Sequence, residues 1–350
     1  IWKEVGALQE NNPIDNRDPL YTLMDGEKKV SIYRDVDRLE KEFLEYAPED
    51  KKAIKRLCSD IRTFKNVHLV VCDLPGVKVK TPVKLNLKSL IKMAPAAFKL
   101  PRLTKQSYLD YLNQFKNKNL RHLLACVIGY RYNALSFVYT LGAFASGDCG
   151  YPLGGSIRMA QNMADTFIKL GGEIKYRCKV ENIEVEDYEV KGVTTQKEGF
   201  IPCDNVIVAC DARTAIDELF DSPLDSYWPN KMRREVVGEQ NMFVCLGVKA
   251  DLAHLPQCMV FPLENNFEYA GCSFAEFRIN NYAKYKDHAP EGCTTVTCLL
   301  LGESYGWWKK AKDDGTYKEK KKILAEKFIA ELEKFIPEIK GNVEDRKSVV

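Results

Sequence analysis

The sequence predicts an α/β segment joined to an α+β remainder, which consists of a helical block and a mixed sheet. Three observations carry this prediction. Helical periodicity dominates residues 84–145, a helix followed by strand-like runs occupies 151–212, and the last third is rich in strand-like alternation. With 350 residues, 45% of them hydrophobic, the chain can build such cores. We expect four parts, at residues 1–148, 149–221, 222–317 and 318–350.

The first part begins with a hairpin and continues with helices. Apolar residues flank the Asp25-Gly26 turn, so 19–33 predicts two short strands. Residues 35–46 and 48–64 predict successive helices, the second with Pro48 in its first turn. The helical block at 84–145 follows a Pro/Gly break. This part should therefore be mostly helical.

The second part has the layout of half of a nucleotide-binding α/β domain. An amphipathic helix is predicted at 156–170, and Gly171 and Gly172 end it. Strands are predicted at 173–180, 182–185 and 189–195, with a short buried strand at 205–210. Asp211 directly follows that strand, where it could cap a helix at 212–220.

The third and fourth parts are predicted to be an antiparallel sheet and a helix with a tail. Strand-like runs occupy 241–250, 260–262, 269–274 and 294–301. The clearest helix is 317–336, where Leu324, Phe328, Leu332 and Phe335 form one stripe and Pro337 follows the last turn.

Charge and cysteine usage exclude several classes of protein. The 52 basic and 49 acidic residues leave a formal charge of +3 without a long single-sign block, which disfavours nucleic acid as a partner. Twelve cysteines occur without a CxxC pair or a signal-peptide pattern, so we expect a reducing cytoplasm. His68, His122, His254 and His288 lack the spacing of zinc ligands, and no metal site is predicted. The longest apolar runs are too interrupted to span a bilayer.

The glycines supply no phosphate-binding fingerprint. None of the 21 is followed by another two residues later, so neither GxGxxG nor GxxxxGK[ST] is present. A GxSxG nucleophile elbow is also missing from the sequence. Generic hydrolase and phosphoryl-transfer functions are therefore disfavoured.

One combination of motifs resembles a known family. It consists of Tyr151-Pro152-Leu153-Gly154-Gly155-Ser156, then Gly171-Gly172-Glu173-Ile174, Val180-Glu181-Asn182-Ile183, Gly192-Val193, and finally Val206-Ile207-Val208-Ala209-Cys210-Asp211-Ala212. This order is similar to that of the flavin-dependent phytoene desaturase (phytoene dehydrogenase-like) and amine oxidase superfamily. The segments Tyr33-Arg34-Asp35 and Ala47-Pro48-Glu49-Asp50 resemble the early substrate-domain region of the same family.

The resemblance implies an incomplete FAD/NAD(P)-binding, Rossmann-like α/β domain with an inserted substrate domain. It assigns FAD contacts to Pro152, Gly154, Gly155, Val180, Ala209 and Asp211. Physically, glycines in a turn let a ligand approach the backbone, and a helix start offers free N–H groups. Two observations argue for a partial chain. The family's dinucleotide fingerprint would precede residue 1, and its glycine-rich C-terminal segment does not appear.

The function implied is transfer of a hydride from an apolar or amine substrate to FAD by the full-length enzyme. We expect the 350 residues alone to be inactive, and the sequence identifies no catalytic side chain. Residues 87–103 could form a peripheral membrane patch. Aromatic and methionine side chains of the helical block could line a substrate tunnel: Met93, Phe98, Tyr108, Tyr111, Phe115, Tyr130, Tyr132, Phe137, Tyr139 and Phe144. The alternative for each is helix packing.

Two other functional interpretations remain open. The same fold serves Rab GDP-dissociation inhibitors, so a non-catalytic binder of lipid chains or prenylated proteins also fits the absence of GxGxxG. An unrelated α+β binding module would make the Pro152-to-Gly155 turn ordinary loop structure and Asp211 only a helix cap. That module predicts no α/β half-domain around 151–212.

Overall fold

A computed structural model describes residues 2–65, 67, 87–236, 238 and 240–349; side chains are described for all of these except 87–93, 348 and 349. The described chain divides into two compact units. The smaller unit comprises Ile1–Gln9 and Ile157–Gly238, and the larger comprises Glu10–Ser156 and Glu239–Val350.

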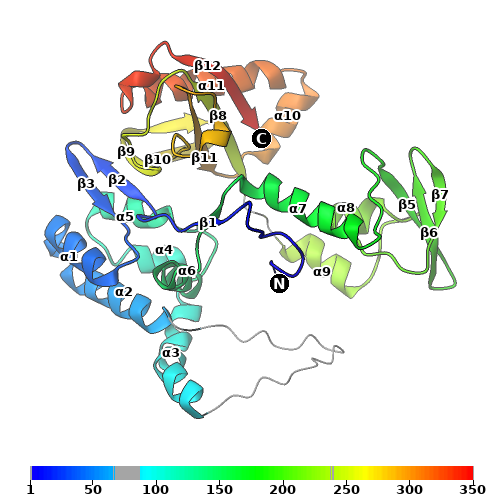
Figure 1. Cartoon of the computed structure of the whole chain (residues 1–350), viewed down its shortest axis with the longest axis horizontal. Coiled ribbons are helices and arrows are strands. Elements are labelled where there is room, and N and C mark those ends of the chain that lie inside the picture. Colours follow the sequence, from blue (N-terminus) through cyan, green and yellow to red (C-terminus); the bar gives the residue numbers. More distant parts are fainter. Residues whose placement is uncertain (1, 66, 68–86, 237, 239, 350) are drawn as a thin grey trace. The chain divides into compact units, whose positions relative to one another are not determined.

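The larger unit contains a seven-stranded sheet in the order β12-β8-β11-β10-β9-β2-β3 (Figure 1). β2 runs parallel to β9, whereas the other neighbours are antiparallel, so the sheet is mixed as predicted. The strands are β2 (Thr22–Asp25), β3 (Lys28–Ser31), β8 (Asn241–Val248), β9 (Cys258–Tyr269), β10 (Cys272–Asn281), β11 (Thr294–Leu301) and β12 (Val343–Val349).

Two helices build an apolar core with the sheet. α10 (Tyr305–Asp313) supplies Trp308, and α11 (Tyr317–Leu332) supplies Leu324 and Phe328. Phe328 packs against Phe277 of β10, with ring centroids 4.9 Å apart. The predicted stripe therefore faces the sheet, although α11 ends four residues before the predicted boundary. A short 3-10 helix, Pro337–Ile339, follows it.

The helical block forms a second apolar core. Its helices are α1 (Val36–Tyr46), α2 (Lys51–Phe64), α3 (Leu87–Lys105), α4 (Tyr108–Leu112), α5 (Lys118–Ala125) and α6 (Ala134–Ser146). Side-chain caps begin two of these helices. The Asp35 carboxylate accepts from two backbone N–H groups of α1, and the Asn133 side chain accepts from the backbone N–H of Ser136 in α6. Val260 of β9 belongs to this core and joins it to the sheet.

A buried carboxylate also joins the helical block to the sheet. Glu276 of β10 accepts from Tyr130 at 3.1 Å and from Arg278 at 3.0 Å, and it bonds His122 of α5 at 2.9 Å. Arg278 also donates to the Tyr130 hydroxyl at 2.7 Å. The Glu276 and Arg278 side chains are about 8% and 10% exposed. Burial alone would raise the Glu276 pKa, but the His122 hydrogen bond and the Arg278 charge hold it below its ordinary value near 4.5.

The smaller unit is built on a three-stranded antiparallel sheet, β5-β6-β7. Its elements are β5 (Val180–Glu186), β6 (Glu189–Thr195), β7 (Gly199–Pro202), α8 (Ala212–Glu218), α9 (Tyr227–Glu235) and the part of α7 (Gly155–Lys169) that begins at Ile157. Ile183 and Ile216 are buried, while many apolar side chains of this unit remain exposed.

The structure differs from the predicted elements at several places. The strand predicted at 269–274 contains the turn between β9 and β10, and β7, α9 and α10 were not predicted. Residues 173–179 form no strand, and β5 begins only at Val180. Residues 205–210 are not a strand either, and the Ile207 side chain is 94% exposed. Neither run has a paired strand among the described residues, and a strand needs a partner for its backbone groups. β12 was not predicted, because Val343–Val349 is a polar edge strand without a clear alternating pattern.

The described helices include none with the length and apolarity needed to cross a bilayer.

We expect Arg278→Met to lower the free energy of unfolding by about 3–5 kcal/mol, because it leaves the buried Glu276 carboxylate without its cationic partner. Urea denaturation measures this loss. The matched control is Arg346→Met, which removes an exposed ion pair to Glu326 and should cost less than about 1 kcal/mol. Equal costs for the two variants would contradict the role of the buried network.

The Glu276 network should also make stability depend on pH. Because the folded-state pKa of Glu276 lies below its unfolded value, ionised Glu276 contributes stability above about pH 4.5, and this contribution is lost as the pH falls through the folded value. The stability gap between the wild type and Glu276→Gln should therefore shrink from pH 6 to pH 3. The exposed Glu319→Gln serves as control, and a gap that stays constant with pH would refute the prediction.

Candidate functional site

The predicted Pro152, Gly154 and Gly155 lie in a tight loop of the larger unit. Its start, β4 (Tyr151–Pro152), pairs antiparallel with β1 (Ile14–Asp15), and the Leu153 N–H donates to the Pro13 carbonyl at 3.0 Å. Gly154 and Gly155 have φ angles of +80° and +67°, a region that side-chain-bearing residues rarely adopt. The two glycines are therefore required by the turn itself.

Around this loop, four side chains form a cluster that we call the tyrosine–histidine cluster: Tyr151, Tyr282, Tyr285 and His288. The Tyr151 hydroxyl lies 3.0 Å from His288 Nε2, and the Tyr282 ring stacks on the imidazole at a centroid distance of 4.9 Å. Tyr285 donates to the Asp15 carboxylate at 2.8 Å. Burial raises the pKa of Tyr151 and of Tyr285, so both phenols keep their protons at neutral pH.

The cluster depends on β-sheet register. Asp15 and Tyr151 are opposite each other in the β1–β4 pair, and both reach the segment that follows β10. In this segment, Lys286–His288 forms a 3-10 turn. The sequence shows no motif at Tyr282, Tyr285 and His288. The only sequence signal for this cluster is the high density of aromatic rings in 282–288. It does not indicate the partners Asp15 and Tyr151, which lie more than 130 positions away.

Val180 and Ala209, in the smaller unit, line one pocket of about 430 Å³. Apolar side chains of β5, β6 and the extended segment 206–209 form much of its wall, including Ile183 and Val193. Lys179, Glu181 and Glu218 also line it. The structure thus brings together two predicted site residues that are 29 positions apart in the sequence.

Asp211, also in the smaller unit, caps α8. Its carboxylate accepts from the N–H groups of Arg213 and Thr214, both at 3.0 Å. Asp211 is therefore a helix cap, which was one of the two roles that the sequence left open. Both hydrogen bonds go to the same carboxylate oxygen.

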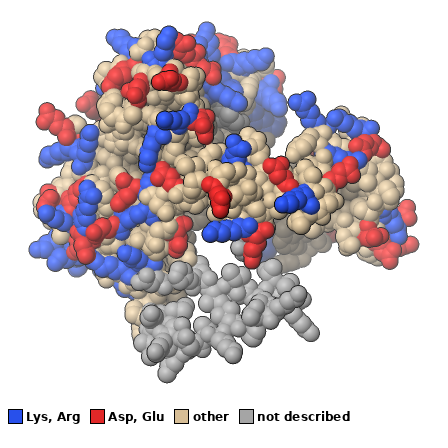
Figure 2. Space-filling view, viewed as in Figure 1, with Lys and Arg blue, Asp and Glu red and all other residues tan. Residues whose placement is uncertain are grey.

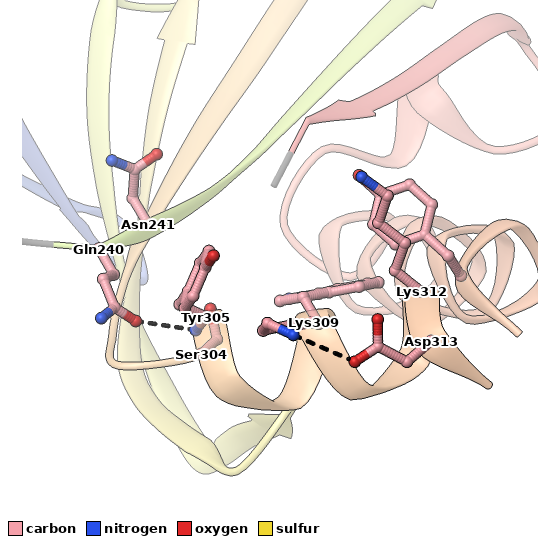
Figure 3. A pocket seen from close by; sticks show the side chains of 9 residues that line it. Gln240, Asn241, Ser304, Tyr305, Lys309, Lys312 and Asp313 are labelled. Carbon is pink, nitrogen blue, oxygen red and sulfur yellow. Dashed lines mark hydrogen bonds and ion pairs between the residues drawn. The ribbon is translucent and has the colours of Figure 1, made fainter. Parts of the chain in front are cut away.

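The larger unit also contains a pocket, of about 550 Å³, between the start of β8 and α10 (Figure 3). The Gln240 side chain accepts from the Tyr305 N–H at 2.8 Å, and Lys309 pairs with Asp313 at 3.3 Å. The aromatic side chains Trp308 and Tyr317 also line it. The sequence showed no motif for this pocket, because its residues come from segments more than sixty positions apart.

The aromatic residues proposed for a tunnel divide into several groups. Tyr108, Tyr111, Phe115, Phe137 and Phe144 are fully buried in the helical core, as the packing alternative predicts. Tyr130 and Tyr139 are partly buried against that core, whereas Phe98 and Tyr132 are exposed. The Met93 side chain lies outside the described residues.

Basic and acidic side chains are mixed across the face seen in Figure 2. In the part of the chain that the structure describes, no three His, Cys, Asp or Glu side chains come together as metal ligands.

The chain is similar to several known proteins. A family model described as flavin containing amine oxidoreductase matches residues 14–347. The chloroplast prolycopene isomerase of Daucus carota is 25% identical over 193 residues, which are 54% of this chain and 31% of the isomerase. The 4,4'-diapophytoene desaturase (4,4'-diapolycopene-forming) of Methylomonas sp. is 23% identical over 247 residues, which are 67% and 46% of the two chains. This chain thus spans less than half the length of either relative.

Solved structures show the same fold at low identity. A putrescine oxidase variant redesigned in its cofactor binding has a TM-score of 0.54 and 13% identity, over 99% of this chain and 69% of the oxidase. An oxidoreductase from Methanosarcina mazei has a TM-score of 0.50 and 15% identity, over 75% and 61% of the two chains. These likenesses confirm the predicted fold class, α/β plus α+β with a mixed sheet and helices.

The packing of Tyr151 over the loop predicts the cost of a side chain at Gly155. An alanine at this position would have to keep a positive φ, and its Cβ would lie 3.0 Å from the Tyr151 hydroxyl. Gly147 also has a positive φ, but a Cβ there would meet nothing within 4 Å, so Gly147→Ala should cost about 1–2 kcal/mol of stability. Gly155→Ala should cost more than this. Adding Tyr151→Phe to Gly155→Ala should recover the difference. Equal urea unfolding energies for the two alanine variants would contradict this packing.

Proposed function

The chain belongs to the family of flavin-containing amine oxidoreductases, and from this premise we propose that the whole protein is an FAD-dependent dehydrogenase or desaturase. Its substrate would be an apolar molecule or an amine that gives up a hydride to the flavin. The relatives support both classes, since one is named a diapophytoene desaturase and the fold neighbour a putrescine oxidase. When bound, the flavin supplies the hydride-accepting chemistry.

The observation that carries this proposal is the apolar pocket of the smaller unit. We propose that Val180 and Ala209 hold the adenine of FAD there, between β5 and the segment 206–209. A pocket of about 430 Å³ with apolar walls and a few polar groups is suited to part of a cofactor. We also propose that Asp211 borders this site, because its carboxylate fixes the start of α8. Pro152, Gly154 and Gly155 would contact the cofactor through the backbone of their turn.

We further propose that the 350 residues are the middle of a longer enzyme and are inactive alone. Exposed apolar side chains of the smaller unit support this, because an apolar surface left in water is suited to a further layer of protein. They include Ile157, Phe167, Ile168, Leu170 and Ile207. Sequence outside the 350 residues would supply GxGxxG and strands that pair with 206–209.

Surface features support two finer proposals. The described cysteines are free thiols, which supports a reducing, cytoplasmic location. On α3 the Phe98 side chain is 86% exposed, which supports peripheral membrane contact. The neighbouring Lys99 and Arg102 are bound to Asp60 at 2.9 and 2.6 Å, so they hold α3 against α2.

The first test is the visible absorption spectrum of the protein purified with its natural flanking sequence. Flavin absorbance that bleaches with dithionite is expected. A folded, colourless protein that also fails to bind added FAD would overturn the oxidoreductase proposal. It would favour a non-catalytic lipid-chain binder on the same fold.

The adenine pocket has its own test. Val180→Asp should weaken FAD binding at least about tenfold, because it places a carboxylate in an apolar wall. The matched control is Val185→Asp, on the same strand, where Val185 is exposed and does not line the pocket. Fluorescence titration with FAD compares the two, and equal affinities would place the adenine elsewhere.

A further inference from the structure

The Arg34 guanidinium donates hydrogen bonds to three backbone carbonyl groups of the larger unit. Nη1 donates to the Phe144 carbonyl at 2.6 Å, Nη2 to the Cys149 carbonyl at 2.6 Å, and Nε to the Arg17 carbonyl at 3.2 Å. The guanidinium carbon also lies 4.3 Å from the centroid of the Phe144 ring. Hydrogen bonds from a charged donor are stronger than those between neutral groups, and the planar guanidinium holds its N–H groups in fixed directions. Arg34 therefore joins segments that lie up to 115 positions apart in the sequence.

Two of these carbonyls flank the β1–β4 pair, one on each strand. If the β1–β4 register continued for two more positions, Arg17 would lie opposite Cys149. The pair ends before this point, because each strand is only two residues long. Pro152, in β4, has no backbone N–H to donate, and so short a ladder is marginal without further support. By bonding both carbonyls, the Arg34 guanidinium joins the two strands where their own pairing has ended.

The glycine turn (Gly154–Gly155) takes its position from this pair. A Cβ on Gly150, which precedes β4, would overlap a side chain of β1, so the chain approaches β1 closely there. At the other end of the pair, the Leu153 N–H donates to the Pro13 carbonyl at 3.0 Å, immediately before the turn. The turn is therefore reached through a short ladder that the Leu153 bond closes at one end and the Arg34 bridge at the other.

The backbone of Arg34 is held as well, so its side chain extends from a fixed point. The Asp18 carboxylate accepts from the Arg34 N–H at 3.1 Å, and the next residue, Asp35, caps α1. Arg34 belongs to the Tyr33-Arg34-Asp35 segment, for which neither the family resemblance nor the proposed function gives a residue a role. This segment joins the start of a helix to the bridge between the two strands.

Resting on the proposed function, we infer that Arg34 is a positioning residue for the cofactor, because its bridge keeps the glycine turn in the arrangement that binds FAD. A lysine cannot replace it, since an ammonium is a point charge without a planar fork. Without the bridge the turn samples other arrangements. The apparent affinity for FAD then falls in proportion to the fraction of molecules that hold the binding arrangement. This loss occurs in the folded protein and is distinct from a loss of overall stability.

The experiment titrates the Arg34→Lys variant with FAD and follows fluorescence, using the protein with its natural flanking sequence. The variant keeps the positive charge but loses the fork, so FAD should bind about tenfold more weakly. The matched control is Arg62→Lys, since Arg62 joins α2 to the Asp37 and Glu40 carboxylates of α1. It should bind FAD as the wild type does. Urea denaturation first identifies conditions in which both variants are folded.

Two results of this titration would overturn the inference. One is an affinity of Arg34→Lys equal to that of the wild type. The other is an equal loss of affinity in Arg62→Lys, because the effect would then follow from any weakened contact of the helical block.

A second readout does not need the cofactor. Hydrogen–deuterium exchange, measured by mass spectrometry, reports how often the backbone hydrogen bonds of residues 149–156 open. In Arg34→Lys these residues should exchange several-fold faster than in the wild type, whereas those of α11 should exchange at the wild-type rate. Unchanged exchange at 149–156 would refute the positioning role even if the protein binds no FAD. Faster exchange, in a protein whose wild type binds no FAD, would refute the proposed function and the cofactor role together, and leave only the structural bridge.

Discussion

The larger unit depends on a carboxylate buried between two apolar cores. Glu276 has three partners, one on its own strand, one on α5 and one in the loop before α6, so the sheet and the helical block share a single hydrogen-bonded centre. Such a centre adds little net stability over a well-packed apolar contact, but removing one partner is costly. It therefore constrains how β10 lies against the helices more than apolar packing alone would. Val260, in the neighbouring strand, reinforces the same junction.

This constraint extends to the tyrosine–histidine cluster. β10 ends at Asn281, whose side-chain amide donates to the Leu252 carbonyl at 2.8 Å and whose oxygen accepts from the Ala283 N–H. Tyr282 follows at once, so its ring position derives from a strand that Glu276 and Arg278 hold in place. The β1–β4 pair brings Asp15 and Tyr151 to the same ring system from the other side. A loop with two positive-φ glycines is thus positioned by contacts from distant parts of the sequence, which suits a site that must not shift when a ligand binds.

Sequence alone predicted the local features of this fold well. The Asp211 cap, the Asp25-Gly26 hairpin and the apolar stripe of α11 follow from neighbouring residues, and the family follows from spaced glycines and prolines. It did not predict which distant groups meet. His122 and Glu276 are 154 positions apart, and Tyr151 and His288 are 137 apart. Such pairs have no periodic signal, since each partner satisfies its own local pattern, and only the tertiary arrangement reveals the bond. β12 was missed because its pairing with β8 outweighs its polar composition.

The strand predicted at 205–210 is the most informative difference. Hydropathy records that a segment is suited to burial, but it does not record what buries it. Leaving a side chain such as Ile207 in water forgoes about 1.5–3 kcal/mol of the stabilisation that its burial would bring. A sequence that retains Val206, Ile207, Val208 and Ala209 in one run therefore fits a chain in which another layer covers them. The pocket against β5 has the same composition, so an adenine and a covering strand would bury neighbouring parts of one apolar surface. Cofactor binding and completion of the smaller unit would then stabilise each other, because each removes water from a surface that the other also needs.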